Sequence, residues 1–508
     1  MQEHILSWIT FLPLIGMAAI LCVPRTNTGL IKAISLAATG IPFVLATWLY
    51  FDLFDKSSAN LQFVQRLDWI TSLGAYYYVG VDGLSLALVW LTTLLLFIAV
   101  PASFGIEKSQ KSYYALLMLL EVGIIGVFVA LDYFLFYVYW EVMLLPMYFL
   151  IGIWGGPRRE YAAIKFFLYT LAGSVLMLVA IVALRLQAGT FSIPELMALA
   201  QSGAMDGSKL PGGGELLGMG FQTWVFWFLF VGFAIKVPVF PFHTWLPDAH
   251  VQAPTPISVI LAGILLKLGG YGMLRACFPI VPDAFRANTY VLGILGVISI
   301  VYGAYVALGQ SDFKRMVAYS SVSHMGYVLL GMAALTEWGM TGAALQMFNH
   351  GTSAAVLFLV VGVIYDRAHH RDLNGFGGIS QVMPKYWALT TWGFFAALGL
   401  PTQAGFVSEA MTLLGAYQSA DTRFQALVVI SLIGIVLTAA FLLWAMQRVF
   451  LGTLNAKYKD YGDMNAREVF CQAPFLALCL ILGVFPWLLT DWMAPTIKLV
   501  VGTLSKSA

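Results

Sequence analysis

A succession of long apolar segments constrains the fold of this chain more than any other feature of its sequence. The hydrocarbon core of a membrane, about 30 Å thick, is crossed by roughly 20 apolar residues in a helix. The segments therefore predict an all-α, polytopic membrane protein with about 14 transmembrane helices. Membrane-spanning strands are not expected, because apolar and polar residues do not alternate in these segments. The predicted helices lie near residues 5–23, 30–51, 83–104, 113–130, 133–154, 161–184, 221–252, 255–278, 290–308, 316–333, 338–365, 387–418, 425–450 and 470–488.

Composition supports this prediction and excludes several other classes of protein. Hydrophobic residues make up 60% of the chain and charged residues only 10%, whereas about 25% of the residues in a soluble protein are charged. The net charge is +2 and no basic run is present, so nucleic-acid binding is not expected. The four cysteines and seven histidines match no metal, haem or disulfide pattern. We therefore expect no metal and no cofactor in this chain.

The distribution of Lys and Arg predicts how the chain is oriented. These residues are more numerous in the loops that follow odd-numbered helices, and such loops usually face the cytoplasm. Both termini are then expected on the outer side of a membrane, most naturally the inner membrane of a bacterium; Lys209 and Lys506 count toward that side. The first apolar segment is expected to remain in the protein, because Met1–Glu3 give it no positively charged leader.

Two segments suggest that the chain contains an inverted repeat. Residues 162–178 and 343–359 are identical at six of 17 aligned positions. They lie in the sixth and eleventh predicted helices, which cross the membrane in opposite directions, and inverted repeats are common in transporters. We therefore expect two inverted five-helix repeats, helices 4–8 and helices 9–13. The regions are 1–112 with helices 1–3, 113–278 and 290–450 with the two repeats, and 470–508 with helix 14 and a tail.

The seventh and twelfth predicted helices are too long for one straight crossing, and each is interrupted. KVPVFP begins at Lys236 and holds Pro238 and Pro241, and GLPTQAG begins at residue 399 and holds Pro401 and Gly405. Proline removes a backbone donor and breaks the helix. Broken helices at matching places in two halves indicate a translocation site. Two ordinary proline kinks are the alternative interpretation.

Four ionisable residues are predicted near the membrane centre, namely Glu141, Lys236, Lys267 and Glu409. Each costs about 3 kcal/mol at that depth on insertion scales, so pairing or function has to offset the cost. Two acids and two bases suit proton transfer, because a Glu141–Lys236 pair that opens and closes would change the proton affinity of Lys236. Static ion pairs that fix helix packing are the alternative.

Histidines and further charged residues extend this set. A neutral imidazole both donates and accepts, so His324 and His350 can relay protons between the lysines and Glu409. The alternative, given the same weight, is that both histidines form hydrogen bonds that hold neighbouring helices together. The possible accessory residues are Glu121, in the middle of helix 4, and His243, Asp248 and His250, for which an interfacial or capping role is favoured.

Long strings of the sequence resemble one known family. AIKVPVFPFHTWLPDAHVQAPT, LAGILLKLGGYGMLR and LFYVYWEVMLLPMYFLIGIWGG are similar to the antiporter-like subunits of respiratory complex I. The resemblance covers nearly the whole chain. Glu409 is typical of one branch of that family, because the sister subunits usually carry lysine there. The family usually has glycine after LP and another small residue before GFV, whereas this chain has Thr402 and Ala404 at those places.

The resemblance implies a proton-pumping subunit in the membrane arm of an NADH–quinone oxidoreductase, with no redox chemistry in this chain. It implies that Glu141 pairs with Lys236, that Lys267 forwards the proton and that Glu409 is the terminal donor, with the two histidines on the same axis. FMN, iron–sulfur clusters and quinone are then expected in partner subunits. Sister antiporter-like subunits and membrane lipids are the expected neighbours.

Three alternative functions remain open at this point. A multisubunit sodium/proton antiporter would show strictly sodium-dependent transport and no quinone-linked activity. A membrane-bound hydrogenase or formate hydrogenlyase would use the same pumping chemistry with another redox partner. A purely structural helix bundle is disfavoured by the four charges at the membrane centre.

Overall fold

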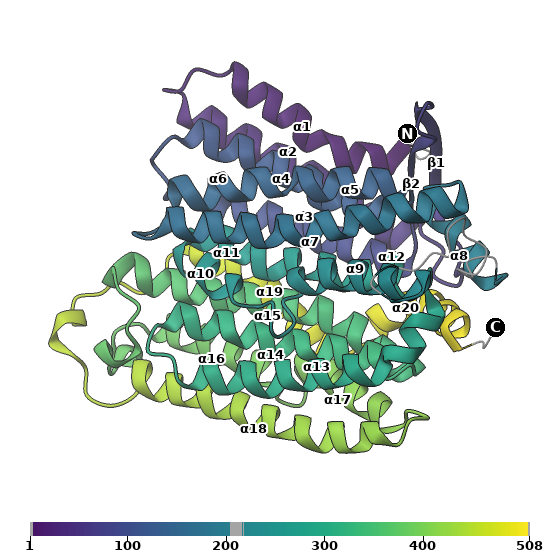
Figure 1. The fold of residues 1–508 in the computed structure, drawn as a ribbon. Coiled ribbons are helices and arrows are strands. Elements are labelled where there is room, and N and C mark those ends of the chain that lie inside the picture. Colours follow the sequence, from purple (N-terminus) through teal and green to yellow (C-terminus); the bar gives the residue numbers. More distant parts are fainter. Residues whose placement is uncertain (1–3, 204–215, 217, 506–508) are drawn as a thin grey trace.

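The computed structural model describes residues 4–203, 216 and 218–505, and it shows a mostly helical protein. The helices run side by side in one bundle, with the N-terminal helices at one edge and α18 at the other (Figure 1). Both ends of the chain lie at one end of the bundle, beside a β-hairpin (Figure 1). We call this end the terminal face and the other end the opposite face. Met1–Glu3, Lys209 and Lys506, which enter the leader and orientation predictions, lie outside the described residues.

The first part of the chain forms three long helices and the hairpin. Their bounds are α1 Ile5–Cys22, α2 Thr28–Trp48 with a π-helical turn Leu49–Leu53, β1 Gln62–Ile70, β2 Ala75–Val81 and α3 Gly83–Ala102. The two strands are antiparallel, with Arg66 opposite Tyr78. Arg66 also forms an ion pair of 2.8 Å with Glu195, which ties the hairpin to a helix further along the chain. The hairpin is an addition to the predicted all-α architecture, and it lies outside the apolar segments.

The next part of the chain contains the first interrupted helix. The bounds are α4 Gln110–Val129, α5 Tyr133–Val142, α6 Leu144–Trp154, α7 Arg159–Ala188, α8 Ile193–Gln201, α9 Phe221–Lys236, α10 Trp245–Gln252, α11 Thr255–Ile260, a π-helical turn Leu261–Leu265 and α12 Leu266–Ala276. α9 and α10 together form the seventh predicted helix, and the break between them contains both predicted prolines.

The last part of the chain contains the second interrupted helix. The bounds are α13 Pro282–Leu308, α14 Phe313–Ala333, α15 Glu337–Ala368, 3-10 turns Leu373–Gly375 and Ile379–Gln381, α16 Pro384–Leu398, α17 Ala404–Tyr417, α18 Arg423–Phe450, a 3-10 turn Ala456–Tyr458, α19 Ala466–Val484 and α20 Trp487–Ser505. α16 and α17 together form the twelfth predicted helix.

Eleven helices of the described residues are long and apolar enough to cross a membrane. The other predicted segments correspond to α14 and to the interrupted pairs α9–α10 and α16–α17. The chain is therefore an integral, multi-pass membrane protein. The number of 14 crossings and the inverted relation of the two repeats remain predictions.

The structure differs from the prediction at the C-terminus, where residues expected to form a tail form helix α20. This helix packs against α3 and α15, and its Lys498 lies 3.5 Å from Glu337 at the start of α15. Asp491, Pro495 and Lys498 interrupt its apolar residues. The segment therefore lacks the continuous apolar run that marks the other helices in the sequence.

Side-chain caps explain where several helices begin. At the start of α3, the Asp82 carboxylate accepts hydrogen bonds from the backbone N–H groups of Leu84 and Ser85. Asp132 caps α5 and Asp312 caps α14 in the same way. Aspartate is favoured at this position because it satisfies backbone donors that have no partner within the helix.

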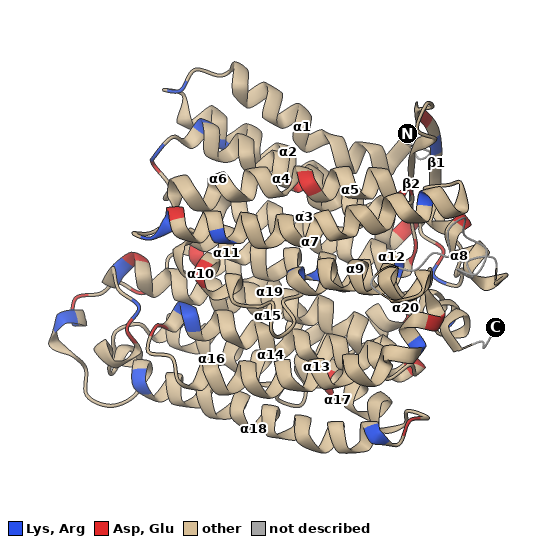
Figure 2. Ribbon diagram, viewed as in Figure 1, with Lys and Arg blue, Asp and Glu red and all other residues tan. Residues whose placement is uncertain are grey.

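The centre of the bundle is formed by α15 and by the composite helix α11–α12. Every residue in the most apolar stretch of each of these two helices is buried. In the corresponding stretches of α7 and α18, only 39% of the residues are buried. Charged residues gather at the two ends of the bundle, and few lie between them (Figure 2). The charged residues that do lie in the middle are thus shielded by protein, as polar groups at membrane depth require.

Candidate functional site

The structure buries five of the six predicted central residues. They come from different helices, α9, α12, α14, α15 and α17, that pack around the centre of the bundle. Their exposed fractions are 1% for Lys236, 0% for Lys267, 5% for His324, 3% for His350 and 6% for Glu409.

The break between α9 and α10 places Lys236 at a helix end inside the protein. Lys236 is the last residue of α9, and the negative end of a helix dipole favours a cation there. The indole N–H of Trp245 donates a hydrogen bond of 2.8 Å to the carbonyl of Ile235, and the N–H of Phe240 donates to the Ser299 hydroxyl at 3.1 Å. Backbone groups at the break are thus partly satisfied by neighbouring residues.

Lys236 and Glu141 are close but form no ion pair. The Lys236 Nζ has no hydrogen-bond partner, and it lies 5.6 Å from the ring centre of Trp140 and 5.2 Å from that of Phe166. Glu141 is partly exposed, although its carboxylate still interacts electrostatically with Lys236. The predicted pair is therefore in an open arrangement, with two aromatic faces beside the amine in place of a carboxylate.

A π-helical turn positions Lys267. The turn Leu261–Leu265 directly precedes the helix that carries this lysine, and such turns release a carbonyl from the regular pattern of helical bonds. The Lys267 Nζ donates to the carbonyl of Ala262, which lies in this turn. It also lies 2.6 Å from His350 Nδ1, which joins α12 to α15 at the centre of the bundle.

Two histidines continue from Lys267 to Glu409. The ring centres of His350 and His324 are 5.5 Å apart, and His324 Nδ1 lies 3.1 Å from Glu409 Oε1. The Nε2 atom of each ring has no hydrogen-bond partner. Lys267, His350, His324 and Glu409 therefore form a chain of neighbouring polar groups that crosses from α12 to α17. We call these four residues the central chain.

The second break positions Glu409. Gly399 ends α16 with a φ of +78°, and a Cβ atom there would lie 3.1 Å from Glu409 Oε2. Gly405 allows α17 to approach α16, because a Cβ atom on it would lie 2.7 Å from the carbonyl of Ala396. Pro401 lies in the turn between the two helices, which is closed by a 2.9 Å hydrogen bond from the Gln403 N–H to the Leu400 carbonyl.

Polar residues that the sequence analysis did not select surround Glu409. The Asn349 side-chain amide donates to the Ala404 carbonyl at 2.8 Å and to the Ser408 hydroxyl at 3.2 Å. The Ser408 hydroxyl in turn donates to the side-chain oxygen of Gln346. The only sequence signal for this cluster was its position beside His350 and Glu409, since buried amides and hydroxyls are common in membrane helices.

The predicted accessory residue Asp248 connects three helices near the opposite face. Its carboxylate accepts from Lys165 of α7 at 2.7 Å and from Arg315 of α14 at 3.1 Å. Asp248 itself belongs to α10, so the ion pairs join the second half of the first broken helix to both of its neighbours. The ion pairs give Asp248 a part in helix packing, and the interfacial or capping role favoured for it remains a prediction.

The other accessory residues lie outside the central chain. His250 is fully buried, with its ring stacked on Phe358 at 4.5 Å, and His243 lies among aromatic rings in the first break. All four ring nitrogens of these histidines lack hydrogen-bond partners. Glu121 is also fully buried, and neither of its carboxylate oxygens has a partner.

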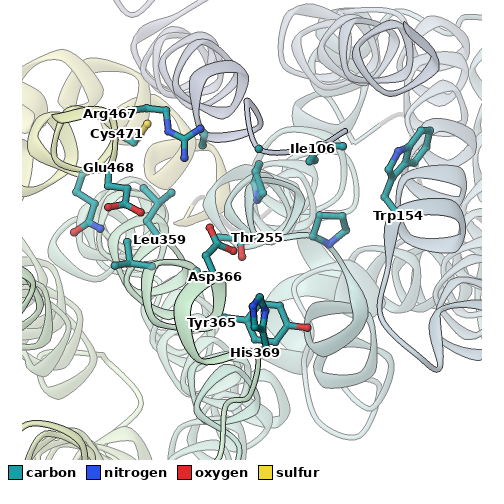
Figure 3. Close-up of a pocket in the computed structure, with 17 residues that line it drawn as sticks. Ile106, Trp154, Thr255, Leu359, Tyr365, Asp366, His369, Arg467, Glu468 and Cys471 are labelled. Atoms are coloured by element: carbon teal, nitrogen blue, oxygen red, sulfur yellow. The ribbon is translucent and has the colours of Figure 1, made fainter. Parts of the chain in front are cut away.

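A cavity of about 370 Å³ that was not predicted from the sequence opens at the opposite face. Figure 3 shows Arg467 and Cys471 of α19 on one side of it, Trp154 on the other, and Thr255 between them. Its lining includes Gln472, which is fully buried and whose amide atoms have no partners. The cavity reaches Leu359, which lies nine residues beyond His350 in α15, or about 13 Å along the helix.

No group of three or more His, Cys, Asp or Glu side chains that could hold a metal ion occurs among the described residues. The polar groups of the central chain are instead arranged in single file. Such an arrangement suits the transfer of a proton, which needs one donor and one acceptor at each step, better than the coordination of a metal cation, which needs several oxygens around one point.

Comparison with known proteins gives the family. Residues 130–438 match the family described as NADH:quinone oxidoreductase/Mrp antiporter, TM. The chain is 45% identical to NADH-quinone oxidoreductase subunit M of Rhodobacter capsulatus, over 98% of this chain and 96% of that protein. It is 39% identical to an NAD(P)H-quinone oxidoreductase chain 4 of Microcystis aeruginosa, over 96% of this chain and 90% of that protein.

A solved structure agrees with these relatives. A chain of respiratory complex I from Thermus thermophilus with bound NADH matches with a TM-score of 0.86 and 28% identity, over 99% of this chain and 100% of that chain. The protein therefore belongs to the family of antiporter-like membrane subunits found in NADH:quinone oxidoreductases and Mrp antiporters. The resemblance noted in the sequence is confirmed.

Proposed function

We propose that this chain is a proton-translocating subunit in the membrane arm of an NADH–quinone oxidoreductase. The relatives named as subunit M and chain 4 of such enzymes cover almost its whole length. The single observation that carries the proton-translocating role is the geometry of the central chain. Lys267, His350, His324 and Glu409 lie next to one another in space, in that order.

The hydrogen bonds of the two histidines define a direction for proton transfer. If Lys267 is charged, its ammonium group donates to His350 Nδ1, and the proton of this ring is then on Nε2. If Glu409 is charged, its carboxylate accepts from His324 Nδ1, and Nε2 of that ring then carries a lone pair. Neither Nε2 atom has another partner. A free donor on one ring is thus matched by a free acceptor on the next.

Proton transfer then takes three steps. Lys267 Nζ gives a proton to His350 Nδ1. A movement of the two rings then brings His350 Nε2 and His324 Nε2, which have no hydrogen-bond partners in this structure, close enough for the proton on His350 Nε2 to pass to His324 Nε2. His324 Nδ1 finally releases its proton to Glu409 Oε1. Each imidazole gains a proton at one nitrogen and loses one from the other, so both rings end neutral. Glu409 finally releases the proton toward the terminal face. Lys236 recharges Lys267, and the opening and closing of the Glu141–Lys236 pair sets the timing.

The orientation follows from the distribution of positive residues. We assign the opposite face to the cytoplasm and the terminal face, with both termini and the hairpin, to the outer side of a bacterial inner membrane. The chain contains two inverted repeats, which are residues 113–278 and 290–450. They lie between an N-terminal region, residues 1–112, and a C-terminal region, residues 470–508. FMN, iron–sulfur clusters and quinone belong to partner subunits, and sister antiporter-like subunits adjoin this one in the membrane.

Purification of the chain in mild detergent tests the proposed assembly. Peripheral iron–sulfur and flavin subunits with NADH–quinone activity should accompany it. A nickel hydrogenase module in their place would assign the same proton chemistry to a different enzyme. Recovery of small membrane subunits alone, with transport that depends strictly on sodium, would contradict the proposal and favour the antiporter branch of the family.

A further inference from the structure

A second hollow, a groove, lies at the opposite face and at the edge of the bundle, and none of the central-chain residues line it. Its volume is about 410 Å³, and it lies between the ends of α13 and α18, two helices that pack together. α18 forms one edge of the bundle (Figure 1). The lining residues used below are Tyr305 of α13, Gln310 and Ser311 after it, Asn374, and Trp444 and Arg448 of α18.

Arg448 presents an unsatisfied cation to this groove. Its guanidinium lies 4.1 Å from the ring centre of Trp444, one turn earlier in α18. One Nη donates a long hydrogen bond of 3.3 Å to Asn374, and Nε is buried with no partner. Asp372 is near enough to attract Arg448, but its carboxylate accepts from the Asn374 N–H instead. Among the described residues, Arg448 has no ion pair.

The groove opens onto an apolar surface that has the chemistry of a lipid-facing helix. On α18, Val429, Ile433 and Val436 are 61%, 51% and 68% exposed. Further along the same side of α18 lies Trp444, which is 46% exposed. Tyr305 of the neighbouring helix α13 is 67% exposed. Tryptophan and tyrosine are enriched where the headgroups of a membrane begin. Arg448 therefore lies at headgroup level, directly above an exposed apolar surface.

We propose that this groove binds one phospholipid molecule, with its phosphate at Arg448 and its acyl chains along α18. Arginine is suited to phosphate because its planar guanidinium offers several N–H donors to the phosphate oxygens. Basic pockets between membrane helices bind phospholipid headgroups in the same way. The phosphate supplies an anionic partner for the Arg448 guanidinium, which has no ion pair among the described residues, and the chains cover the apolar surface that the protein leaves open.

Photolabelling of the intact membrane complex tests the proposal. The complex is reconstituted in vesicles of phosphatidylcholine and phosphatidylglycerol, with a trace of phosphatidylglycerol that carries a diazirine near the headgroup end of one chain. Irradiation should label peptides of α13 and α18 around Tyr305 and Trp444. Arg448→Gln should lower that label roughly tenfold, the effect expected for loss of a hydrogen bond to a charged group, and Arg448→Lys should retain most of it.

Arg423→Gln is the matched control, because Arg423 lies at the other end of α18 and is already paired with Asp421 at 2.7 Å. It should leave the label unchanged. The unmodified complex provides a second test: excess phosphatidylglycerol should remove the label, whereas excess of a galactolipid without phosphate should not. The proposal is wrong if Arg448→Gln labels normally, if free inorganic phosphate displaces the label, or if only a neighbouring subunit is labelled.

Discussion

His350 is the residue on which the continuity of the central chain depends, because it lies between Lys267 and His324. Replacement of His350 by leucine keeps a side chain of similar size and removes both ring nitrogens. Since a positioned acid–base group accelerates proton transfer by about 10² to 10⁴, His350→Leu should slow proton translocation by at least about 10². The rate is measured with a pH-sensitive dye inside vesicles that contain the assembled complex.

His243→Leu is a suitable control for that measurement. His243 is equally buried and its ring nitrogens also lack partners, but it lies among aromatic rings in the first break instead of in the central chain. Equal loss of translocation in both variants would indicate that the histidines matter only for packing.

Thr402 is one of the two residues at which the sequence departs from the usual family pattern. It has a φ of +80°, a conformation that is strained for a β-branched residue and easy for glycine. Thr402→Gly should therefore raise the free energy of unfolding by about 1 kcal/mol. Thermal denaturation in detergent measures this effect. A lower melting temperature would mean that the threonine side chain makes contacts worth more than the strain it causes.

At the scale of secondary-structure elements, α19 supports the second break. A Cβ atom on Gly483 would lie 2.1 Å from the carbonyl of Thr402, so the end of α19 touches the backbone of the turn that precedes Glu409. Gly483→Ala should push the two elements apart and destabilise the protein by about 1–3 kcal/mol, as measured by thermal denaturation.

Gly502→Ala in α20 provides the matched control for this substitution, since a Cβ atom there would meet nothing within 4 Å. It should be neutral or slightly stabilising, because alanine favours a helix more than glycine does. Equal destabilisation by both alanines would show that the contact between α19 and the turn has no special role.

The interrupted helices are the elements that the sequence predicted best. Pro238, Pro241 and Pro401 cannot continue a helix, so the positions of both breaks follow from local chemistry. Helix α20 and the hairpin were not predicted, because their stability depends on contacts with distant residues. α20 rests on α3 and α15, and the hairpin is tied to Glu195; neither partner is visible in the local sequence.

In the functional site, too, some features could be predicted from the local sequence and others depend on contacts between distant residues. Buried charges in apolar segments identified Lys236, Lys267 and Glu409, because each is costly at membrane depth. The contact between Lys267 and His350 could not be predicted, since it depends on a π-helical turn and on the packing of α12 near α15. The open arrangement of Lys236 and Glu141 likewise depends on where Trp140 and Phe166 lie.

At the scale of the whole molecule, the central chain connects elements of the two proposed repeats. Lys267 belongs to the composite helix α11–α12 in the first, and His350, His324 and Glu409 belong to helices of the second. The two breaks flank this chain, one at Lys236 and the other before Glu409. In the proposed mechanism, a proton taken up in one repeat therefore leaves through the other.

In the proposed mechanism, protons cross this subunit through Lys267. The most direct test is the proton translocation rate per assembled complex in vesicles driven by NADH, measured for Lys267→Met and for the control Lys165→Met. Lys165 is also a lysine within a membrane helix, but it pairs with Asp248 outside the central chain. Both variants should assemble normally, and only Lys267→Met should lose translocation. An unchanged translocation rate in Lys267→Met would show that protons do not pass through this lysine.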